Sequence, residues 1–186
     1  MKTYKCKKGG NVPDGGLPCV VCSHQKPAGV FSGPVCEYLE ESETGTFSIL
    51  VIEDDNLKAK DVRGVLEESF PGSGIDTAAA YGSGIRKVFK GNYDFVILDN
   101  SLPYYEEKPY DIHPDMAQLI LEEILDFSEE TRPKCIICSQ YDPGEKEAYF
   151  SRITTQYPNC LGFVRYDCCT DAWKAQLVRI IKENIE

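Results

Sequence analysis

The sequence has no long hydrophobic run. No stretch approaches the roughly 18 apolar residues that a membrane-spanning helix needs. The first ten residues, MKTYKCKKGG, are basic, but no apolar segment follows them, so we predict no signal peptide. Both absences favour a cytoplasmic protein. In a reducing cytoplasm the nine cysteines are expected to be thiols or metal ligands rather than disulfides.

Positive charge is also scarce. The chain has 20 lysines and arginines against 30 aspartates and glutamates, which gives a formal net charge of -10. Residues 1–46 hold five lysines and five acids, so residues 47–186 carry the whole excess of negative charge. Such a chain is repelled by phosphate backbones and by anionic membrane surfaces. We therefore expect neither nucleic acid nor a membrane as a partner.

The texture of the sequence changes at Phe47. Residues 1–46 are rich in glycine, proline, cysteine and lysine and show no strand or helix period, so we predict a small Cys-rich module and linker there. Residues 47–186 alternate short apolar runs with amphipathic stretches five times. This alternation predicts an α/β domain with a five-stranded parallel sheet and helices on both faces. The runs are continuously apolar, as expected for strands that are covered on both sides.

Acidic residues follow two of the predicted strands. The stretch FSILVIEDDN places Glu53, Asp54 and Asp55 directly after an apolar run, and Asp99 follows the apolar run FVIL. The carboxyl ends of parallel strands meet at one edge of a sheet, so we expect Glu53 and Asp54 to lie beside Asp99. Clustered carboxylates repel one another, and a Mg²⁺ ion relieves that repulsion. We expect Asp55 to be solvated.

This cluster predicts phosphoryl chemistry. An Asp99 carboxylate beside Mg²⁺ can attack a phosphoryl group, because the metal offsets charge on the group being transferred. Ser139 follows the apolar run CIIC and could donate a hydrogen bond to a phosphoryl oxygen. Residues that follow strands are often only helix caps or turn residues, but three carboxylates at one edge favour a metal site.

Three segments together resemble the receiver domain of two-component response regulators, the CheY-like domain. They are ILVIEDDN, YDFVILDNSLP and CIICSQ, in that order. The resemblance covers residues 47–186 and implies a flavodoxin-like fold with strand order 2-1-3-4-5. It further implies a phosphoacceptor, Asp99, and a switch residue, Ser139. The Mg²⁺ ligands that it implies are Glu53, Asp54, Asp99 and the backbone carbonyl of Ser101.

The same resemblance implies partners and a route for the signal. A sensor histidine kinase or a phosphotransfer protein would supply the phosphoryl group. We expect a single-domain regulator whose output is a protein contact. In the family, the switch residue acts on an aromatic residue of the fifth strand, here Phe163. The expected output face is made by the fourth helix, the fifth strand and the fifth helix.

Three departures from the family pattern keep other functions open. Tyr166 occupies the position of the usual lysine, and Arg165 could substitute only if the end of the strand is bulged. Gln140 stands where a small residue is usual, and the loop after Pro103 is long. The alternative is a receiver-like docking module that is not phosphorylated. A Mg²⁺-dependent phosphatase is disfavoured, because Ser101 occupies the place of its general acid.

The cysteines near the start suggest a second metal. The segment PCVVC has the spacing of a zinc knuckle, and four thiolates could hold one Zn²⁺ ion. The predicted ligands are Cys6, Cys19, Cys22 and Cys36, with His24 as a competitor. The segment resembles a degenerate zinc ribbon, and a flexible tail with incidental thiols is the alternative. Cys135 and Cys138 lie in a predicted strand and point to opposite faces, so we expect no joint metal binding there.

Overall fold

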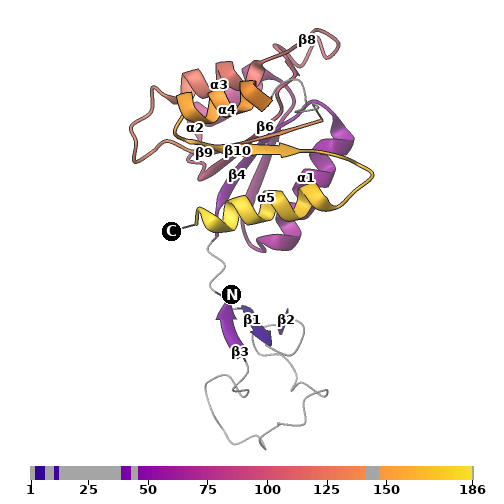
Figure 1. The fold of residues 1–186 in the computed structure, drawn as a ribbon, viewed down its shortest axis with the longest axis vertical. Coiled ribbons are helices and arrows are strands. Elements are labelled where there is room, and N and C mark those ends of the chain that lie inside the picture. Colours follow the sequence, from indigo (N-terminus) through magenta and orange to yellow (C-terminus); the bar gives the residue numbers. More distant parts are fainter. Residues whose placement is uncertain (1–2, 7–10, 13–38, 43–45, 141–146, 186) are drawn as a thin grey trace, which may run out of the picture. The chain divides into compact units, whose positions relative to one another are not determined.

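The computed structural model describes residues 3–6, 11–12, 39–42, 46–140 and 147–185 (Figure 1). The chain divides into two units, Met1–Thr44 and Gly45–Glu186. Each unit has its own hydrogen-bonded sheet.

The first unit contains a small antiparallel sheet. Its strands are β1 (Thr3–Cys6), β2 (Asn11–Val12) and β3 (Leu39–Ser42), in the order β2-β1-β3. No strand was predicted in this segment, because four residues or fewer are too short to show a period. Cys6 lies in β1. The other predicted zinc ligands, Cys19, Cys22, Cys36 and the competitor His24, lie outside the described residues.

The second unit is built on a five-stranded parallel sheet, as predicted. The sheet order is β10-β9-β6-β4-β5, which reads 2-1-3-4-5 from the other edge when the five strands are numbered along the chain. The strands are β4 (Ser48–Ile52), β5 (Gly74–Ala78), β6 (Phe95–Leu98), β9 (Lys134–Ser139) and β10 (Cys160–Arg165). All residues of β6 are buried, which explains its continuously apolar sequence.

Helices cover both faces of this sheet. They are α1 (Asn56–Ser69), α2 (Tyr81–Lys90), α3 (Met116–Ile124), α4 (Glu147–Gln156) and α5 (Ala172–Glu183). In Figure 1, α1 and α5 lie below the sheet, and α2, α3 and α4 lie above it.

Two apolar clusters result from the alternation of side chains along each strand. Ile49 and Val51 of β4 pack with α1 and α5, whereas Leu50 and Ile52 pack with the other three helices. Cys135 and Cys138 belong to different clusters, so the prediction that they point to opposite faces is confirmed. The helices thus fix both sides of the sheet and leave its carboxyl-end edge to carry polar groups.

The long loop after β6 contains a hairpin that the sequence did not predict. Its strands, β7 (Leu102–Pro103) and β8 (Ile112–His113), pair in antiparallel fashion. The loop returns to the sheet where the backbone N–H of Met116 donates to the carbonyl of Asn100 at 3.0 Å. Within the described residues, no helix has the length and apolar character to cross a membrane.

Candidate phosphoryl and metal site

Glu53 and Asp99 stand side by side at the carboxyl end of the sheet. Ile52 and Leu98, the residues that precede them, are partners in the β4–β6 register. The backbone N–H of Asp99 donates to the carbonyl of Ile52, and that of Glu53 donates to Ala78, each at 2.9 Å. These bonds continue the ladder one residue past the strands and fix both backbones.

The predicted carboxylate cluster is formed. One oxygen from each of Glu53, Asp54 and Asp99 lies within 4.8 Å of the others. Glu53 and Asp99 are buried, and Asp54 is partly exposed. Burial, and then the charge of Asp99, raise the pKa of Glu53 to about 7, against the opposing effect of a nearby lysine. Burial also raises the pKa of Asp54. Both shifts indicate that the cluster needs positive charge nearby.

Lys58 of α1 supplies that charge. Its Nζ atom lies 2.6 Å from Glu53 Oε2 and 2.6 Å from Asp99 Oδ1. Its side chain is only 3% exposed. Lys58 was not among the predicted site residues, although helical spacing gave a signal. It stands four residues before Val62 and seven before Val65, which are buried in α1, so it lies on the inward stripe.

Asp55 fixes the position of Lys58, because it caps the N-terminus of the helix that carries this lysine. Its side-chain Oδ1 accepts hydrogen bonds from the backbone N–H groups of Leu57, at 2.8 Å, and Lys58, at 3.2 Å. Asp55 is therefore the N-cap of α1, and it is exposed to solvent as predicted. The cap sets where α1 begins, and hence which of its residues reach the carboxylates.

The loop after Asp99 holds the carboxylate from its other side. The backbone N–H of Ser101 donates to Asp99 Oδ2 at 3.0 Å. Asn100 is fully buried, and the hydroxyl of Tyr149 on α4 donates to its Oδ1 at 3.4 Å. Asp99 thus has one oxygen on Lys58 and the other on the backbone. The predicted use of the Ser101 carbonyl as a metal ligand stays a prediction.

Ser139 ends β9, the strand next to β6. It is buried, and its carbonyl accepts a hydrogen bond from the backbone N–H of Tyr166 at 2.9 Å. By register Ile137 pairs with Leu98, so Ser139, two residues after Ile137, lies at the same edge as Asp99. Gln140, the next residue, is exposed. Ser139, the predicted switch residue, therefore stands on the predicted edge, beside the segment that ends β10.

Arg165 and Tyr166 point to different environments at the end of β10. Arg165 pairs with Ser139 in the register and is exposed, whereas Tyr166 is buried. The register of β10 does shift, but between Cys160 and Gly162 rather than at the strand's end. The role of Arg165 as a substitute cation stays a prediction. Lys58 is a buried cation that contacts Asp99.

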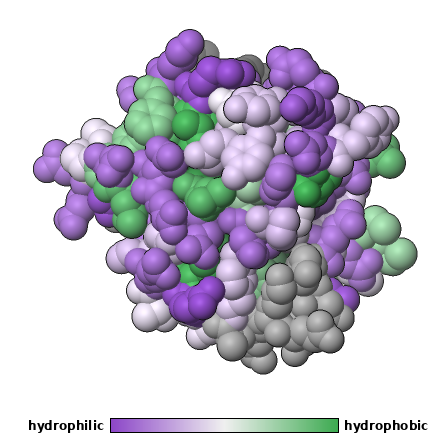
Figure 2. Space-filling view, turned by 90° about the horizontal axis from the view of Figure 1, so that it is seen from above, coloured by the Kyte–Doolittle hydropathy of each residue, from purple (hydrophilic) through white to green (hydrophobic). Residues whose placement is uncertain are grey.

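The loop 104–111 presents tyrosines near this edge. Tyr104 packs edge-on against Tyr81 of α2, with ring centres 5.6 Å apart, and its carbonyl accepts from the N–H of Gly82. Tyr105 and Tyr110 are exposed. Figure 2, seen from above, shows hydrophobic residues in small separate patches among hydrophilic ones. A partner on that face would therefore need polar contacts as well as apolar ones.

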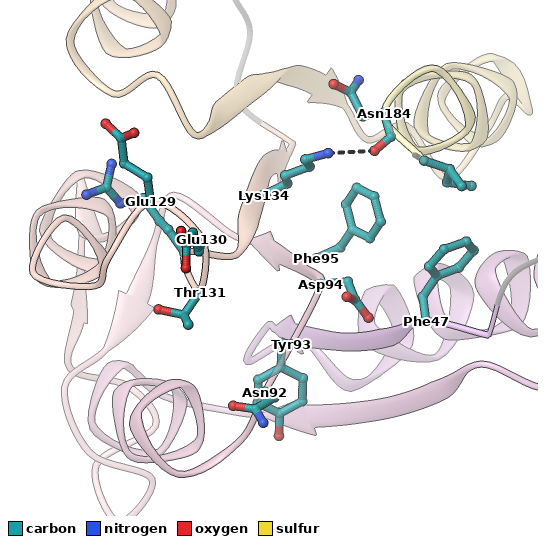
Figure 3. Close-up of a pocket in the computed structure, with 12 residues that line it drawn as sticks. Phe47, Asn92, Tyr93, Asp94, Phe95, Glu129, Glu130, Thr131, Lys134 and Asn184 are labelled. Carbon is teal, nitrogen blue, oxygen red and sulfur yellow. Dashed lines mark hydrogen bonds between the residues drawn. The ribbon is translucent and has the colours of Figure 1, made fainter.

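A hollow at the opposite end of the sheet is unrelated to the carboxylates. It has a volume of about 590 Å³ and includes Phe47, Phe95 and Lys134, near the amino ends of β4, β6 and β9 (Figure 3). Lys134 Nζ donates to the carbonyl of Asn184 at 2.8 Å across it. Sites in parallel sheets gather at the carboxyl ends of strands, so the carboxylate edge is the candidate functional site.

Comparison by sequence found no matching family profile and no matching curated protein. Comparison of structures found receiver domains. The CheY-like receiver domain of Methanospirillum hungatei JF-1 is 18% identical, with a TM-score of 0.50, covering 75% of this chain and 93% of that one. The chemotaxis response regulator CheY4 of Vibrio cholerae is 14% identical, with a TM-score of 0.55, covering 73% and 99%.

A third structure agrees with these two. The signal receiver domain of a DNA-binding response regulator from Colwellia psychrerythraea 34H is 21% identical, with a TM-score of 0.53, covering 74% of this chain and 96% of that one. At such identities the likeness concerns the fold and not the chemistry of single residues. The second unit of this chain therefore has the fold of CheY-like response regulator receiver domains.

Proposed function

We propose that this chain is a response regulator receiver that accepts a phosphoryl group on Asp99 with the help of Mg²⁺. The observation that supports this most is the cluster of Glu53, Asp54 and Asp99 oxygens within 4.8 Å, at the carboxyl-end edge of a receiver fold. A histidine kinase or a phosphotransfer protein of the cytoplasm would be the donor. Output would be a contact with another protein.

The transfer step makes one bond and breaks one. An oxygen of the Asp99 carboxylate attacks the phosphorus of a phosphohistidine. The P–N bond breaks, its electron pair stays on the imidazole nitrogen, and that nitrogen takes up a proton. Asp99 then carries an acyl phosphate. When bound, Mg²⁺ would offset the negative charge of the transferring group.

The residues present fit a Mg²⁺ ion. Hard carboxylate and carbonyl oxygens are its preferred ligands, and Glu53, Asp54, Asp99 and the carbonyl of Ser101 offer such atoms. Two of these oxygens now contact Lys58 Nζ. Lys58 therefore shares two of its carboxylate partners with the proposed metal site.

Intact mass after incubation with acetyl phosphate and Mg²⁺ tests the proposal. Wild type should gain the mass of one phosphoryl group, and the gain should disappear with a chelator or in Asp99→Asn. Asp126→Asn is a matched control, because Asp126 is an exposed aspartate away from the site, and this variant should behave like wild type. Modification that persists in Asp99→Asn, or none in wild type, would contradict the proposal.

The second candidate is a docking module that is not phosphorylated. Lys58 favours it, because a buried lysine between Glu53 and Asp99 already neutralises part of the cluster without a metal. In that case the chain would show neither Mg²⁺ binding nor modification in the same experiment. Its affinity for a partner would be the same with and without a phosphodonor.

We also propose that the first unit binds zinc through Cys6, Cys19, Cys22 and Cys36. The support is the spacing of the sequence. A short segment with little core gains much of its stability from a bound metal.

A further inference from the structure

The resemblance to receiver domains implies a lysine at the end of β10. In this chain Tyr166 occupies that position, and Lys58 brings an ammonium group to the site from α1. Tyr166 fills the end of the strand with a buried ring, whose hydroxyl donates to Asp61 Oδ2 at 2.7 Å and whose centre lies 4.8 Å from that of Trp173. Lys58 enters from α1 instead, and its Nζ lies 5.7 Å from the centre of the Tyr166 ring. The ring therefore packs beside the ammonium group and confines it next to the carboxylates.

We propose that Lys58 is the charge-neutralising residue of phosphoryl transfer in this chain, and that it moves from Glu53 to the phosphoryl group when Asp99 is modified. This rests on the proposed function. Nζ already contacts Asp99 Oδ1, and in an acyl phosphate the phosphorus is bonded to a carboxylate oxygen and carries the new anionic oxygens. The flexible stem of lysine allows the ammonium group to shift while α1 stays in place.

The same geometry makes Lys58 a competitor of the metal. Lys58 Nζ contacts one oxygen of Glu53 and one of Asp99 at 2.6 Å, and the same two carboxylates would hold Mg²⁺. If the positive charge of Lys58 were removed, the three carboxylates would attract the metal more strongly. The phosphoryl group, however, would lose a partner. Removing the charge should therefore change the two affinities in opposite directions, which a lysine that supports the fold from outside the site would not do.

Lys58→Met separates these effects, because methionine keeps an unbranched side chain and removes the charge. The fluorescence of Trp173, which packs on Tyr166, follows titration with Mg²⁺ alone and then with beryllofluoride, a phosphoryl mimic, at saturating Mg²⁺. We expect Mg²⁺ to bind Lys58→Met about tenfold more tightly and beryllofluoride about tenfold more weakly, the size of a typical coupling between two sites. Lys60→Met, at an exposed position of the same helix, should leave both affinities unchanged.

The outcomes separate this inference from the proposed function. If wild type binds neither Mg²⁺ nor beryllofluoride, the proposed function fails. If wild type binds both and Lys58→Met binds both equally well, only the role of Lys58 is wrong. Tighter Mg²⁺ binding with unchanged beryllofluoride binding overturns the movement to the phosphoryl group. Where circular dichroism shows that Lys58→Met does not fold, Lys58→Gln carries the same test.

A second, independent observation lies in the loop between β10 and α5. The ligand atoms of Asp167, Cys168 and Cys169 lie within 4.8 Å of one another, and the two sulfurs are 3.9 Å apart. Both cysteines are exposed. Asp167 organises the loop, because its Oδ1 accepts from the N–H of Cys169 at 2.9 Å and its Oδ2 accepts from the hydroxyl of Thr170 at 3.3 Å.

This spacing suits a metal ion better than a disulfide. Adjacent residues joined by a trans peptide have Cα atoms about 3.8 Å apart, below the usual range for a disulfide. Two thiolates bound tetrahedrally at about 2.3 Å would stand about 3.8 Å apart, close to the observed separation. We propose that Cys168 and Cys169 bind a thiophilic divalent cation, with Asp167 as third ligand.

Titration of the full chain with Cd²⁺, followed by thiolate-to-metal charge-transfer absorbance, tests this site. Wild type should bind one more Cd²⁺ than Cys168→Ser with Cys169→Ser, because all other cysteines are common to both. Asp167→Asn should keep the count and weaken binding of that ion about tenfold. Equal counts in wild type and the double variant, or binding of the extra ion only at millimolar Cd²⁺, would overturn the proposal.

Discussion

The hydroxyl of Tyr166 donates to Asp61 at 2.7 Å and ties the end of β10 to α1, the helix that carries Lys58. The two residues are 105 positions apart in the sequence. The bond holds the Tyr166 ring beside Lys58 Nζ, so this aromatic residue helps to place the lysine at the carboxylates.

Tyr166→Phe should therefore lower stability modestly. The loss of one hydrogen bond costs about 0.5–1.5 kcal/mol, and the exposed Asp61 can turn to water, so we expect the lower half of that range. Urea unfolding measures the change. Tyr110→Phe is the control, because Tyr110 is almost fully exposed and should be neutral. Equal stability of Tyr166→Phe and wild type would show that the bond contributes nothing.

Two glycines in helices should respond in opposite ways to alanine. A Cβ atom at Gly84 of α2 would lie 2.6 Å from Ile52 Cδ1, whereas a Cβ at Gly64 of α1 meets nothing within 4 Å. Ile52 is fully buried and has little room to move. Gly84→Ala should lower the free energy of unfolding by about 1–3 kcal/mol, because the core at α2 would be overpacked. Gly64→Ala should raise the free energy of unfolding by about 0.5–1 kcal/mol, because alanine has the higher helix propensity. Thermal unfolding of the pair decides, and a stabilised Gly84→Ala would contradict the close packing of α2 on β4.

The prediction of zinc concerns the first unit. Protein purified without added metal should contain about one zinc per chain that is lost in Cys19→Ser with Cys22→Ser, since four thiolates close a structural site. Elemental analysis measures it. Cys135→Ala with Cys138→Ala is the matched control, because it removes two buried thiols of the second unit for which we expect no joint metal binding. Zinc that is absent from wild type, or unchanged by the first pair of substitutions, would exclude the four-thiolate site.

Periodicity and strand ends predicted much of this structure, and specific long-range contacts account for what was missed. The five strands, the helices on both faces and the meeting of Glu53 with Asp99 follow from apolar runs and from the rule that parallel strands end at one edge. Lys58 was missed because a charged residue in the first turn of a helix is usually solvated. Only the burial of Glu53 and Asp99 beside it makes the inward position favourable. The hairpin of β7 and β8 has two residues per strand, too few for any period.

Alkaline pH should destabilise the second unit in part through Tyr93. Burial, and then the hydrogen bond that its hydroxyl donates to Asp76, raise the pKa of Tyr93 from about 10 to about 12. Between these values the folded chain holds a proton that the unfolded chain has lost, so stability falls as pH rises through this window. Tyr93→Phe should show a shallower fall between pH 10 and 12 in urea unfolding. An unchanged slope would mean that Tyr93 ionises equally easily in both states.

The last prediction concerns how a phosphoryl group on Asp99 would change the environment of Phe163 on β10. The ring of Phe163 on β10 stacks on that of Phe150 on α4, with centres 3.9 Å apart, and its carbonyl accepts from the side-chain amide of Gln176 on α5 at 3.0 Å. Phe163 thus contacts both helices of the predicted output face. Ser139 stands two residues beyond Ile137, the register partner of Phe163, on the adjacent strand.

A hydrogen bond from the Ser139 hydroxyl to the phosphoryl group would shift the end of β9 and, through β10, the stacking of Phe163. We expect beryllofluoride with Mg²⁺ to change the NMR signals of Phe163 and Phe150 in wild type. In Ser139→Ala the mimic should still bind, because Asp99 and the metal ligands are intact, but the aromatic signals should stay near those of the free chain. Ser151→Ala, a serine on the exposed side of α4, is the control and should respond like wild type.

A ligand shifts such an equilibrium only by its different affinity for the two states. Identical aromatic shifts in Ser139→Ala and wild type would therefore show that Ser139 does not carry the coupling, and unchanged shifts in wild type would favour the docking module.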